Sequence, residues 1–405
     1  MVLIAIVFLL MAVLSIVAIT FVFGAGSRSL IVRKQIVMEQ AMYVAEGGIE
    51  TAVAHIDLWG ASATNLTGTI GFGTFAAAIS LTNIVGQATS TVLIRSVGTV
   101  KGVSRIVNVR GLRNKTWAKY ALWSSQNHGV YFISGEKFYG PVHANDDLWF
   151  SGDPEFFSRV TSASSTFGGS TNSCVFHDGY YRPVPTDTMA AVDFSSLKSN
   201  STLVVTGATT IVFSGTNALV TNSARKWTKY VYKLVPETVI YAADSGSKVG
   251  TVDVSGRLDG RVTLVADTDI QIVSNLTYAV DPATNSASND ALGLISGRDI
   301  IVKTSFPNNG EIHAHMMATG KSTTGTTDGS FGVENYSSRS PSGTLTVYGG
   351  IVQNYRGAVG TFSGSSIVSG FSKNYTYDSR FSVNPPPRYP PLSDEFGWEV
   401  WKEGD

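Results

Sequence analysis

The stretch that decides the fold opens the chain: MVLIAIVFLLMAVLSIVAITFVF at residues 1–23, followed by GAG at residues 24–26. Within the first 23 residues the polar side chains are those of Ser15 and Thr20. A helix rises about 1.5 Å per residue, so a run of this length can cross a bilayer. We therefore expect a membrane-spanning helix or its equivalent.

The start of this helix has an unusual charge pattern. Secretory signals and signal anchors normally carry basic residues before their apolar core, whereas the first cation here is Arg28. We therefore expect that a leader has been removed and that Met1 is the terminus of the processed protein. Gly24 and Gly26 follow the apolar run, and glycine weakens a helix interior. These glycines predict a joint where the helix loosens in an assembled state.

Beyond this joint the helix pattern becomes amphipathic. Small or aliphatic residues recur at helical spacing and form a narrow stripe: Ala41, Ala45, Gly48, Ala52 and Ile56. Small side chains let backbones approach closely, so we expect this half of the helix to pack against another helix or a sheet. The helical domain is predicted over residues 1–59.

The composition restricts the class of protein. The chain has 405 residues, 30 basic and 30 acidic side chains, and only 15% charged residues. A nucleic-acid-binding protein would carry a basic surface, so we expect no nucleic acid as a partner. Cys174 is the single cysteine and cannot form an internal disulfide. No nucleophile, phosphate-binding or zinc motif is present, so we predict no enzyme and no cofactor.

A second domain is predicted over residues 60–122. Residues 60–87 read as a connector in which residues 75–79 could form a short helix. Residues 90–97 and 103–110 alternate β-branched residues around a glycine-bearing turn and predict a β-hairpin.

The third predicted domain, residues 123–384, is β-rich. Its expected strands are residues 130–134, 138–143, 147–150, 203–205, 210–213, 229–234, 238–242, 251–254, 261–265, 269–273, 293–295, 299–302, 311–317 and 344–352. Such short strands with glycine turns predict a β-solenoid or a β-sandwich, and the echo between successive strand pairs favours the solenoid. The fold class is thus α+β, mainly β.

Two segments depart from this strand pattern. Residues 151–200 are rich in Gly and Ser and predict a loop insertion with one helix over residues 187–197. Residues 385–405 begin with a proline run, which cannot pair as a central strand, and predict an extended strap that ends the sheet. Phe396, Trp398 and Trp401 in this tail are expected to anchor it to the protein body or to a neighbouring subunit.

Some polar clusters resemble ligand sets. Glu311, His313 and His315 alternate along one expected strand and share a face, as metal ligands can. A structural polar row is the favoured interpretation, because the sequence supplies no evident fourth ligand. The acidic groups of residues 145–147 and 267–269 could bind calcium, but neither has the spacing of a calcium loop, so solvated turns are favoured. No metal site is predicted.

Three motifs resemble type IV pilins and pseudopilins, in particular minor-pilin-like proteins with large β-rich heads. They are AMYVAEGGIE at residues 41–50, LIRSVGTVKGVSRIVNV at residues 93–109, and GPVHANDDL at residues 140–148. The resemblance implies that a prepilin peptidase removes a basic leader and that Met1 becomes N-methylated. It also implies that the apolar helices bundle into a filament core. Main pilins usually carry Glu where this chain has Ala5, which is a departure shared with some minor pilins.

The sequence therefore predicts a structural subunit of an extracellular pilus-like filament on the bacterial surface. The helix would lie in the inner membrane before assembly and then in a homopolymer built by the pilus assembly machinery, with the β-rich head on the filament surface. The expected filament-core residues are Met1, Ala5, Ser15, Thr20, Ala41, Ala45, Gly48 and Ala52. The alternatives are a low-copy tip or priming minor pilin, and a membrane-anchored β-helix that binds or cleaves carbohydrate.

Overall fold

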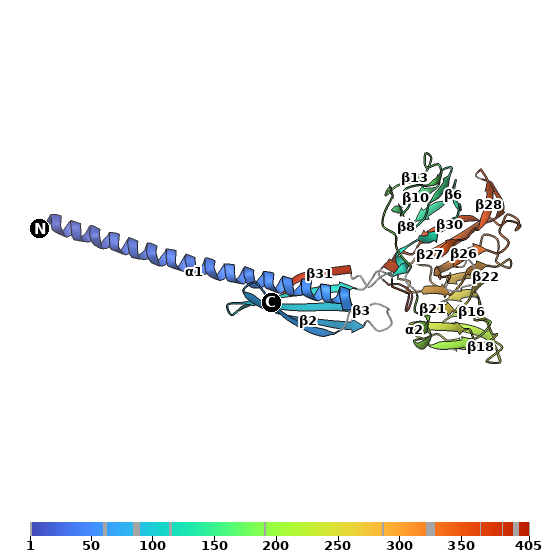
Figure 1. Cartoon of the computed structure of the whole chain (residues 1–405), viewed down its shortest axis with the longest axis horizontal. Coiled ribbons are helices and arrows are strands. Elements are labelled where there is room, and N and C mark those ends of the chain that lie inside the picture. Colours follow the sequence, from blue (N-terminus) through green and yellow to red (C-terminus); the bar gives the residue numbers. More distant parts are fainter. Residues whose placement is uncertain are drawn as a thin grey trace. The chain divides into compact units, whose positions relative to one another are not determined.

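The computed structural model describes residues 2–59, 63–83, 90–112, 116–189, 192–285, 287–320, 329–364, 366–382, 384–391 and 397–404. The chain forms two compact units, each shown in Figure 1. Unit 1 takes Met1–Asn83, Thr89–Arg113 and Asp394–Asp405, and unit 2 takes Asn114–Ser393. Unit 2 is thus inserted, in chain order, between two segments of unit 1.

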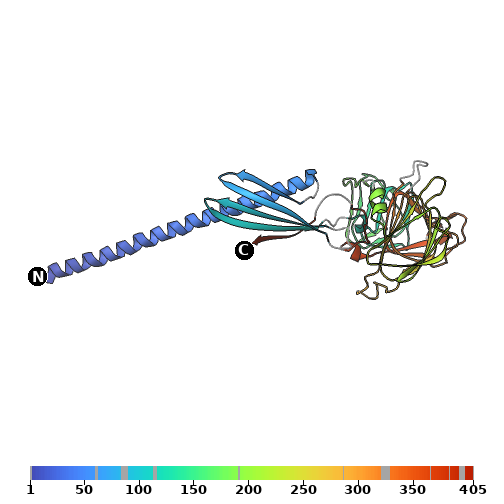
Figure 2. The same cartoon turned by 90° about the horizontal axis from the view of Figure 1, so that it is seen from below.

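Unit 1 packs one helix against one sheet. The helix is α1 (Val2–Trp59). The antiparallel sheet has five strands in the order β1 (Thr64–Ile70), β2 (Gly73–Asn83), β3 (Ser90–Val100), β4 (Val103–Leu112) and β31 (Gly397–Gly404). The C-terminal half of α1 runs along this sheet (Figure 2). Strand side chains alternate between faces, so Phe75, Ala77 and Ile79 are buried under the helix while their neighbours point outward.

The predicted hairpin is present as β3 and β4, which turn at Lys101 and Gly102. Other segments of unit 1 differ from the sequence prediction, and the first is residues 64–70, which were expected in a connector and form strand β1. Residues 75–79, for which a short helix was considered, lie inside strand β2, because their alternate side chains fill the helix-facing core. Residues 397–404 were expected to belong to a tail, but they pair with β4 and complete the sheet. Trp398 and Trp401 lie in this strand, and Phe396 lies outside the described residues.

Unit 2 is a stack of parallel strands. In spatial order the first ladder contains β15 (Leu203–Thr206), β19 (Thr238–Ala243), β21 (Arg261–Ala266), β23 (Ala291–Ser296), β25 (Glu311–Ala318), β27 (Thr344–Arg356), β5 (Leu122–Gln126), β8 (Val142–Ala144), β11 (Val160–Ser162) and β14 (Tyr180–Tyr181). The second contains β16 (Thr209–Gly215), β20 (Val252–Leu258), β22 (Ile270–Tyr278), β25, β27, β30 (Ser372–Tyr377), β7 (Lys137–Tyr139), β10 (Glu155–Phe156) and β13 (Val175–Phe176). Parallel ladders stacked coil on coil form the solenoid that the sequence favoured over a sandwich.

Smaller elements complete the stack. β24 (Ile300–Val302) and β26 (Ser330–Val333) extend a further ladder from β22. β6 (Tyr131–Ile133), β9 (Trp149–Ser151) and β12 (Gly168–Gly169) pair side by side, and β28 (Gly360–Ser363) pairs with β29 (Ser366–Gly370). β17 (Asn217–Asn222) pairs antiparallel with β16, and β18 (Trp227–Lys233) pairs antiparallel with β17 at one end of the stack.

The order of coils in unit 2 differs from their order in the chain. The chain enters in the middle of the stack at β5 and winds out to β13 and β14. It then continues at the opposite end with β15 and winds back to β27 and β30. In Figure 1 the colours of neighbouring coils accordingly change from teal to red at this point. We call the boundary where β27 and β30 pair with β5 and β7 the seam.

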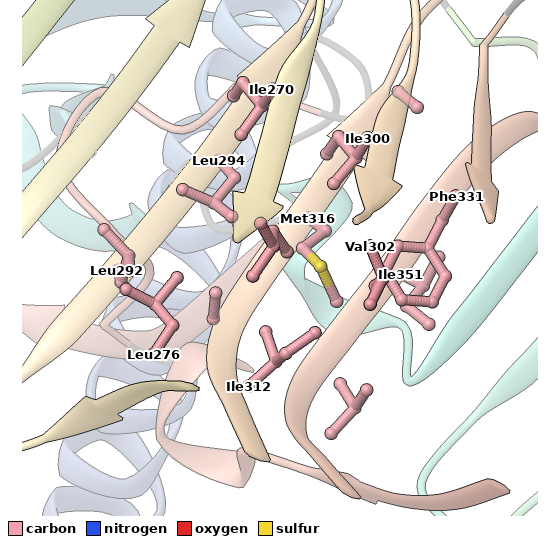
Figure 3. Close-up of a cluster of buried hydrophobic side chains, with 14 of the residues drawn as sticks. Ile270, Leu276, Leu292, Leu294, Ile300, Val302, Ile312, Met316, Phe331 and Ile351 are labelled. Atoms are coloured by element: carbon pink, nitrogen blue, oxygen red, sulfur yellow. The ribbon is translucent and has the colours of Figure 1, made fainter. Parts of the chain in front are cut away.

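Four strands of the first ladder, β19, β21, β23 and β25, are buried on both faces. Their inward side chains join the solenoid core shown in Figure 3, where Leu294, Ile312 and Met316 lie among other aliphatic residues. Their outward side chains are covered by a second cluster from η1 (Trp117–Lys119), α2 (Phe194–Ser199), η2 (Ser379–Ser382) and residues 385–391. The proline run therefore lies over the outer face of the solenoid, and Trp117 N donates to Pro390 O at 3.2 Å.

The strand positions after residue 200 agree closely with the prediction. The loop insertion expected over residues 151–200 is not found among the described residues of that range. Residues 151–200 contribute β10, β11, β12, β13 and β14, which are further coils and not a loop. Their strands are too short to show a period, and stacked rings such as Phe156 on Phe176, 5.2 Å apart, stabilise them instead. The helix expected over residues 187–197 is α2, which begins at Phe194 after Asp193 caps the Ser196 N–H.

Candidate functional site

The N-terminal half of α1 exposes apolar side chains on all sides. Phe8, Leu9 and Phe21 are 69%, 67% and 78% exposed. Among the described residues, this is the one helix long and apolar enough to cross a membrane, with a mean hydropathy of 3.3 over 18 residues that are not buried in the chain. A helix that is apolar all round needs lipid or other apolar chains around it. We call residues 2–23 the apolar segment and treat it as the candidate functional surface.

The polar residues of the apolar segment suit an apolar environment. Ser15 donates its hydroxyl to Met11 O at 2.8 Å, and Thr20 donates to Ile16 O at 2.9 Å. Both donors are satisfied within the helix, so neither adds an unpaired donor to the surface. Ala5 lies exposed on the same surface, and Met1 lies outside the described residues.

The helix is continuous where the sequence predicted a joint. α1 runs through Gly24 and Gly26 without a break, because the cost of about 1 kcal/mol per glycine is small for a helix of this length. No heavy atom lies within 4 Å of a Cβ built on either glycine. The single chain therefore contains no joint, and loosening in an assembled state stays a prediction.

The small-residue stripe packs inside unit 1. Ala41, Ala45 and Ala52 are fully buried, and Gly48 is also buried. They contact the sheet through a cluster that includes Phe75, Val92, Ile94, Val107 and Val109. These stripe residues were expected in a filament core, but the chain's own sheet covers them. The assignment to inter-subunit packing is corrected, because a surface buried within the subunit cannot also contact a neighbouring helix.

Two glycines determine how closely the helix approaches the sheet. A Cβ on Gly98 of β3 would overlap Ala41 O and Ala45 N of the helix backbone. A Cβ on Gly48 of α1 would overlap the Ser96 hydroxyl and lie 2.9 Å from the Phe75 ring. Glycine at both positions thus allows contact between the two backbones, as the small-residue pattern indicated.

The candidate metal ligands of β25 have structural partners. His315 Nδ1 lies 2.7 Å from the Tyr389 hydroxyl, and its Nε2 lies 3.1 Å from Tyr120 O. Burial lowers the pKa of His315 to about 3, so the ring is neutral at pH 7. His313 Nε2 lies 3.8 Å from Glu311, and burial lowers its pKa as well. No group of ligands with metal-binding geometry is found among the described residues.

The acidic corners bind protein groups. Asn145 is hydrogen-bonded to both the backbone N–H and the carbonyl of Asp187, at 3.0 and 2.7 Å. Asp269 pairs with Arg298, and Asp267 accepts the Tyr241 hydroxyl. These side chains hold coil corners and crossing segments together.

A buried charged cluster lies at the seam. Lys373 Nζ is 2.8 Å from one carboxylate oxygen of Glu136 and 3.1 Å from the other, and it also donates to Tyr131 O. Arg356 lies 3.8 Å from the centre of the Phe132 ring and donates to Val130 O at 3.0 Å. Burial lowers the pKa of Arg356 to about 10, and the Glu136 carboxylate opposes this effect. No sequence spacing indicates this cluster, because its members come from opposite ends of unit 2.

The chain is similar to a protein family of unknown function and to a solved pilin structure. A family profile described as "Domain of unknown function (DUF4900)" matches residues 80–174, which include the β3–β4 hairpin and the first coils of unit 2. No curated protein matches the chain. Among solved structures, the chain is similar to the competence-associated pilin ComZ from Thermus thermophilus, at 11% identity and a TM-score of 0.37. That alignment covers 91% of this chain and 97% of the pilin, and a TM-score of this size does not establish a shared fold.

Proposed function

We propose that the chain is a structural subunit of a type IV pilus-like filament. The observation that carries the proposal is the apolar segment, which is exposed on every side and continues directly into a helix half docked on a sheet. A membrane or a bundle of equivalent helices can cover such a segment, and a filament of this kind offers both in succession. Unit 2 would then supply surface for external contacts.

The docked half of α1 explains how the apolar segment could project from a folded body. Gly48 and Gly98 allow close backbone contact, and the buried aliphatic residues around them hold the helix on the sheet. The apolar segment itself would provide helix-to-helix packing between copies. Its satisfied hydroxyls and lack of charged side chains would let it pass from the inner membrane to the filament core without leaving a side-chain donor unpaired.

Ala5 bears on the position within the filament. Glu39 is the first acidic residue of the chain, so no carboxylate of the apolar segment is available to pair with a neighbour's amine. Cohesion of the apolar segment would rest on van der Waals packing. This feature also suits a low-copy tip or priming subunit. Abundance along the fibre would distinguish the two placements.

Fibres sheared from the source cells test the proposal. We expect electron microscopy to show regular fibres whose peptides match this chain. Leu14→Arg should remove the chain from fibres, because a cation in the apolar segment costs about 3 kcal/mol in an apolar core. Leu14→Met keeps the segment apolar and should assemble normally. Immunoblots of the membrane fraction show whether the arginine variant still reaches the membrane. Fibres that never contain this chain would refute the proposal.

A further inference from the structure

Three adjoining hollows lie beside the seam on the surface of unit 2. The central hollow, about 450 Å³, lies between residues 128–133 of an early coil and residues 358–364 near the end of the unit. A second hollow of about 390 Å³ shares His128, Val130 and Tyr336 with it. A third of about 600 Å³ shares Ile133, Phe362 and Lys373 with the central one. Because the hollows share walls, we treat them as one feature, the seam groove.

Aromatic rings line the seam groove, and those of Tyr131 and His128 are held by neighbouring rings. Tyr131 and Tyr336 are 38% and 37% exposed, so part of each ring faces solvent. The Tyr131 ring is supported edge-on by Trp149, with ring centres 5.4 Å apart. His128 stacks on Tyr355 at 4.3 Å, and this pair joins an early coil to a late one. Rings held in this way can contact a flat apolar ligand face without first losing conformational freedom.

The charged groups of the groove are engaged with protein partners. Lys373 is paired with Glu136, and Arg356 donates to Val130 O. Asp299 accepts hydrogen bonds from Gly329 N at 3.0 Å and from Ser330 N at 2.8 Å. Glu334 pairs with Lys303 and accepts from Thr304 N at 3.0 Å. An ionic ligand would compete with these interactions, so the groove favours a neutral ligand.

A peptide cannot add as a strand to β27 or β30, two of the strands that border the groove. β27 already pairs with β25 and β5, and β30 already pairs with β27 and β7, so their backbone edges are occupied. The groove presents aromatic faces together with uncharged polar side chains such as Ser134, Thr344 and Asn374. This combination matches a chain of neutral sugar rings. Each sugar ring has an apolar face of C–H groups and a rim of hydroxyls.

We propose that the seam groove binds a neutral polysaccharide, with Tyr131 and Tyr336 stacking on sugar rings. This proposal rests on the proposed function, in which unit 2 makes the external contacts. It names a neutral polysaccharide as the ligand of those contacts. The groove lies within unit 2, and binding to it requires no filament. Assembly and binding can therefore fail independently.

Titration of the detergent-solubilised full chain tests the proposal. The probes are cellohexaose, maltohexaose, mannohexaose and chitohexaose, with polygalacturonate as an anionic comparison, and calorimetry is the readout. We expect at least one neutral hexasaccharide to bind. Tyr131→Ala and Tyr336→Ala should each weaken its binding about tenfold, the effect of losing one ring contact. Tyr131→Phe keeps the ring and should bind like the unmodified chain.

Tyr230→Ala is the matched control, because Tyr230 is an exposed tyrosine on β18, away from the residues that line the groove. Circular dichroism shows whether each variant remains folded. Absence of binding to all neutral probes would overturn the proposal. Tighter binding of polygalacturonate than of every neutral hexasaccharide would also overturn it. So would folded Tyr131→Ala and Tyr336→Ala variants that bind the neutral hexasaccharide as tightly as the unmodified chain. Fibre formation is scored separately, so a chain that assembles but does not bind refutes this inference alone.

Discussion

At the scale of single residues, His315 shows how unit 2 buries a titratable ring. A neutral imidazole has one donor and one acceptor, which match Tyr120 O and the Tyr389 hydroxyl. Burial lowers the His315 pKa to about 3, whereas the unfolded value is about 6.5. The unfolded chain therefore binds the proton first as the pH falls.

This difference predicts a loss of stability in acid. The contribution of His315 is complete above about pH 6.5 and declines as the pH falls towards 3. Between pH 7 and pH 5 the free energy of unfolding of unit 2 should fall by about 2 kcal/mol from this residue. Burial lowers the pKa of His143 and His313 in the same direction. Urea unfolding at several pH values, followed by the fluorescence of buried Trp117 and Trp123, measures the effect.

His315→Gln should make this pH dependence shallower, although it also lowers stability at pH 7 by disturbing the Tyr389 and Tyr120 contacts. His177→Gln, at an exposed position beside Glu155, serves as the comparison for the loss of a surface imidazole. An unchanged slope in the His315 variant would show that another group causes the acid sensitivity.

The Lys373–Glu136 pair gives a second residue-scale prediction. Their side chains are 6% and 2% exposed, so removing Lys373 leaves the Glu136 carboxylate buried without its ion-pair partner. Lys373→Met should lower the free energy of unfolding by about 3–5 kcal/mol. The double change Lys373→Met with Glu136→Leu should cost less than Lys373→Met alone, because it removes both charges.

The pair Lys303–Glu334 is the comparison, since both of its side chains are partly exposed. Glu334→Gln should cost less than about 1 kcal/mol. Urea unfolding of the unmodified chain, Lys373→Met, Glu136→Leu and the double variant gives the coupling energy of the Lys373–Glu136 pair. A double variant no more stable than Lys373→Met would contradict a charge effect and indicate lost packing instead.

At the scale of elements, unit 1 depends on how closely α1 approaches β3. Gly98→Val should push the helix away, because the new side chain meets backbone atoms of Ala41 and Ala45 that cannot rotate aside. The expected cost is about 1–3 kcal/mol or more. Hydrogen exchange followed by mass spectrometry should show faster exchange over residues 41–56.

Gly24→Ala is the matched control for this change, because no atom lies within 4 Å of its new methyl group. Exchange over residues 41–56 should stay as in the unmodified chain. Unchanged exchange in the Gly98→Val chain would mean that the helix contact tolerates a larger side chain and that the glycine requirement is wrong.

At the scale of the whole chain, the seam is where the last coils of unit 2 in chain order pair with the first ones. Coils that pair across it are far apart in sequence, as in the register partners Lys137 and Asn374. Bringing such distant segments together costs chain entropy, which the seam contacts must offset. The interval between Trp117 and Pro390, which are hydrogen-bonded, spans nearly all of unit 2. The two ends of the unit therefore meet, as an inserted domain requires.

Engineered disulfides can measure the chain-entropy cost of bringing the two sides of the seam together. Lys137→Cys with Asn374→Cys joins register partners across the seam, and Lys137→Cys with Glu155→Cys joins register partners within adjacent early coils. Both pairs have parallel-strand geometry. The seam disulfide should stabilise unit 2 by about 2 kcal/mol more, because its loop is about thirteen times longer. Cys174→Ser is included in both chains, and urea unfolding under oxidising and reducing conditions gives the difference. Equal stabilisation would argue against an entropic cost of closing the seam.

Much of the local structure follows from the sequence alone. The apolar run of residues 1–23 specifies a helix that needs an apolar environment, since its composition leaves no polar face. The alternation around Gly102 specifies the β3–β4 hairpin, and glycine-bounded strands specify a stacked β-rich unit. The small-residue stripe also correctly indicated close backbone packing. These features depend on neighbours within a few positions, so their periodicity is visible in the chain.

Only the tertiary structure decided which surfaces meet. The stripe of α1 contacts the chain's own sheet, residues 397–404 return to that sheet as β31, and β5 pairs with β27 across the seam. The partners in each case are chosen by burial among segments that are far apart in sequence. A residue pattern specifies that a face must be covered, but many distant segments could cover it. The choice among them is made by the packing of the whole fold.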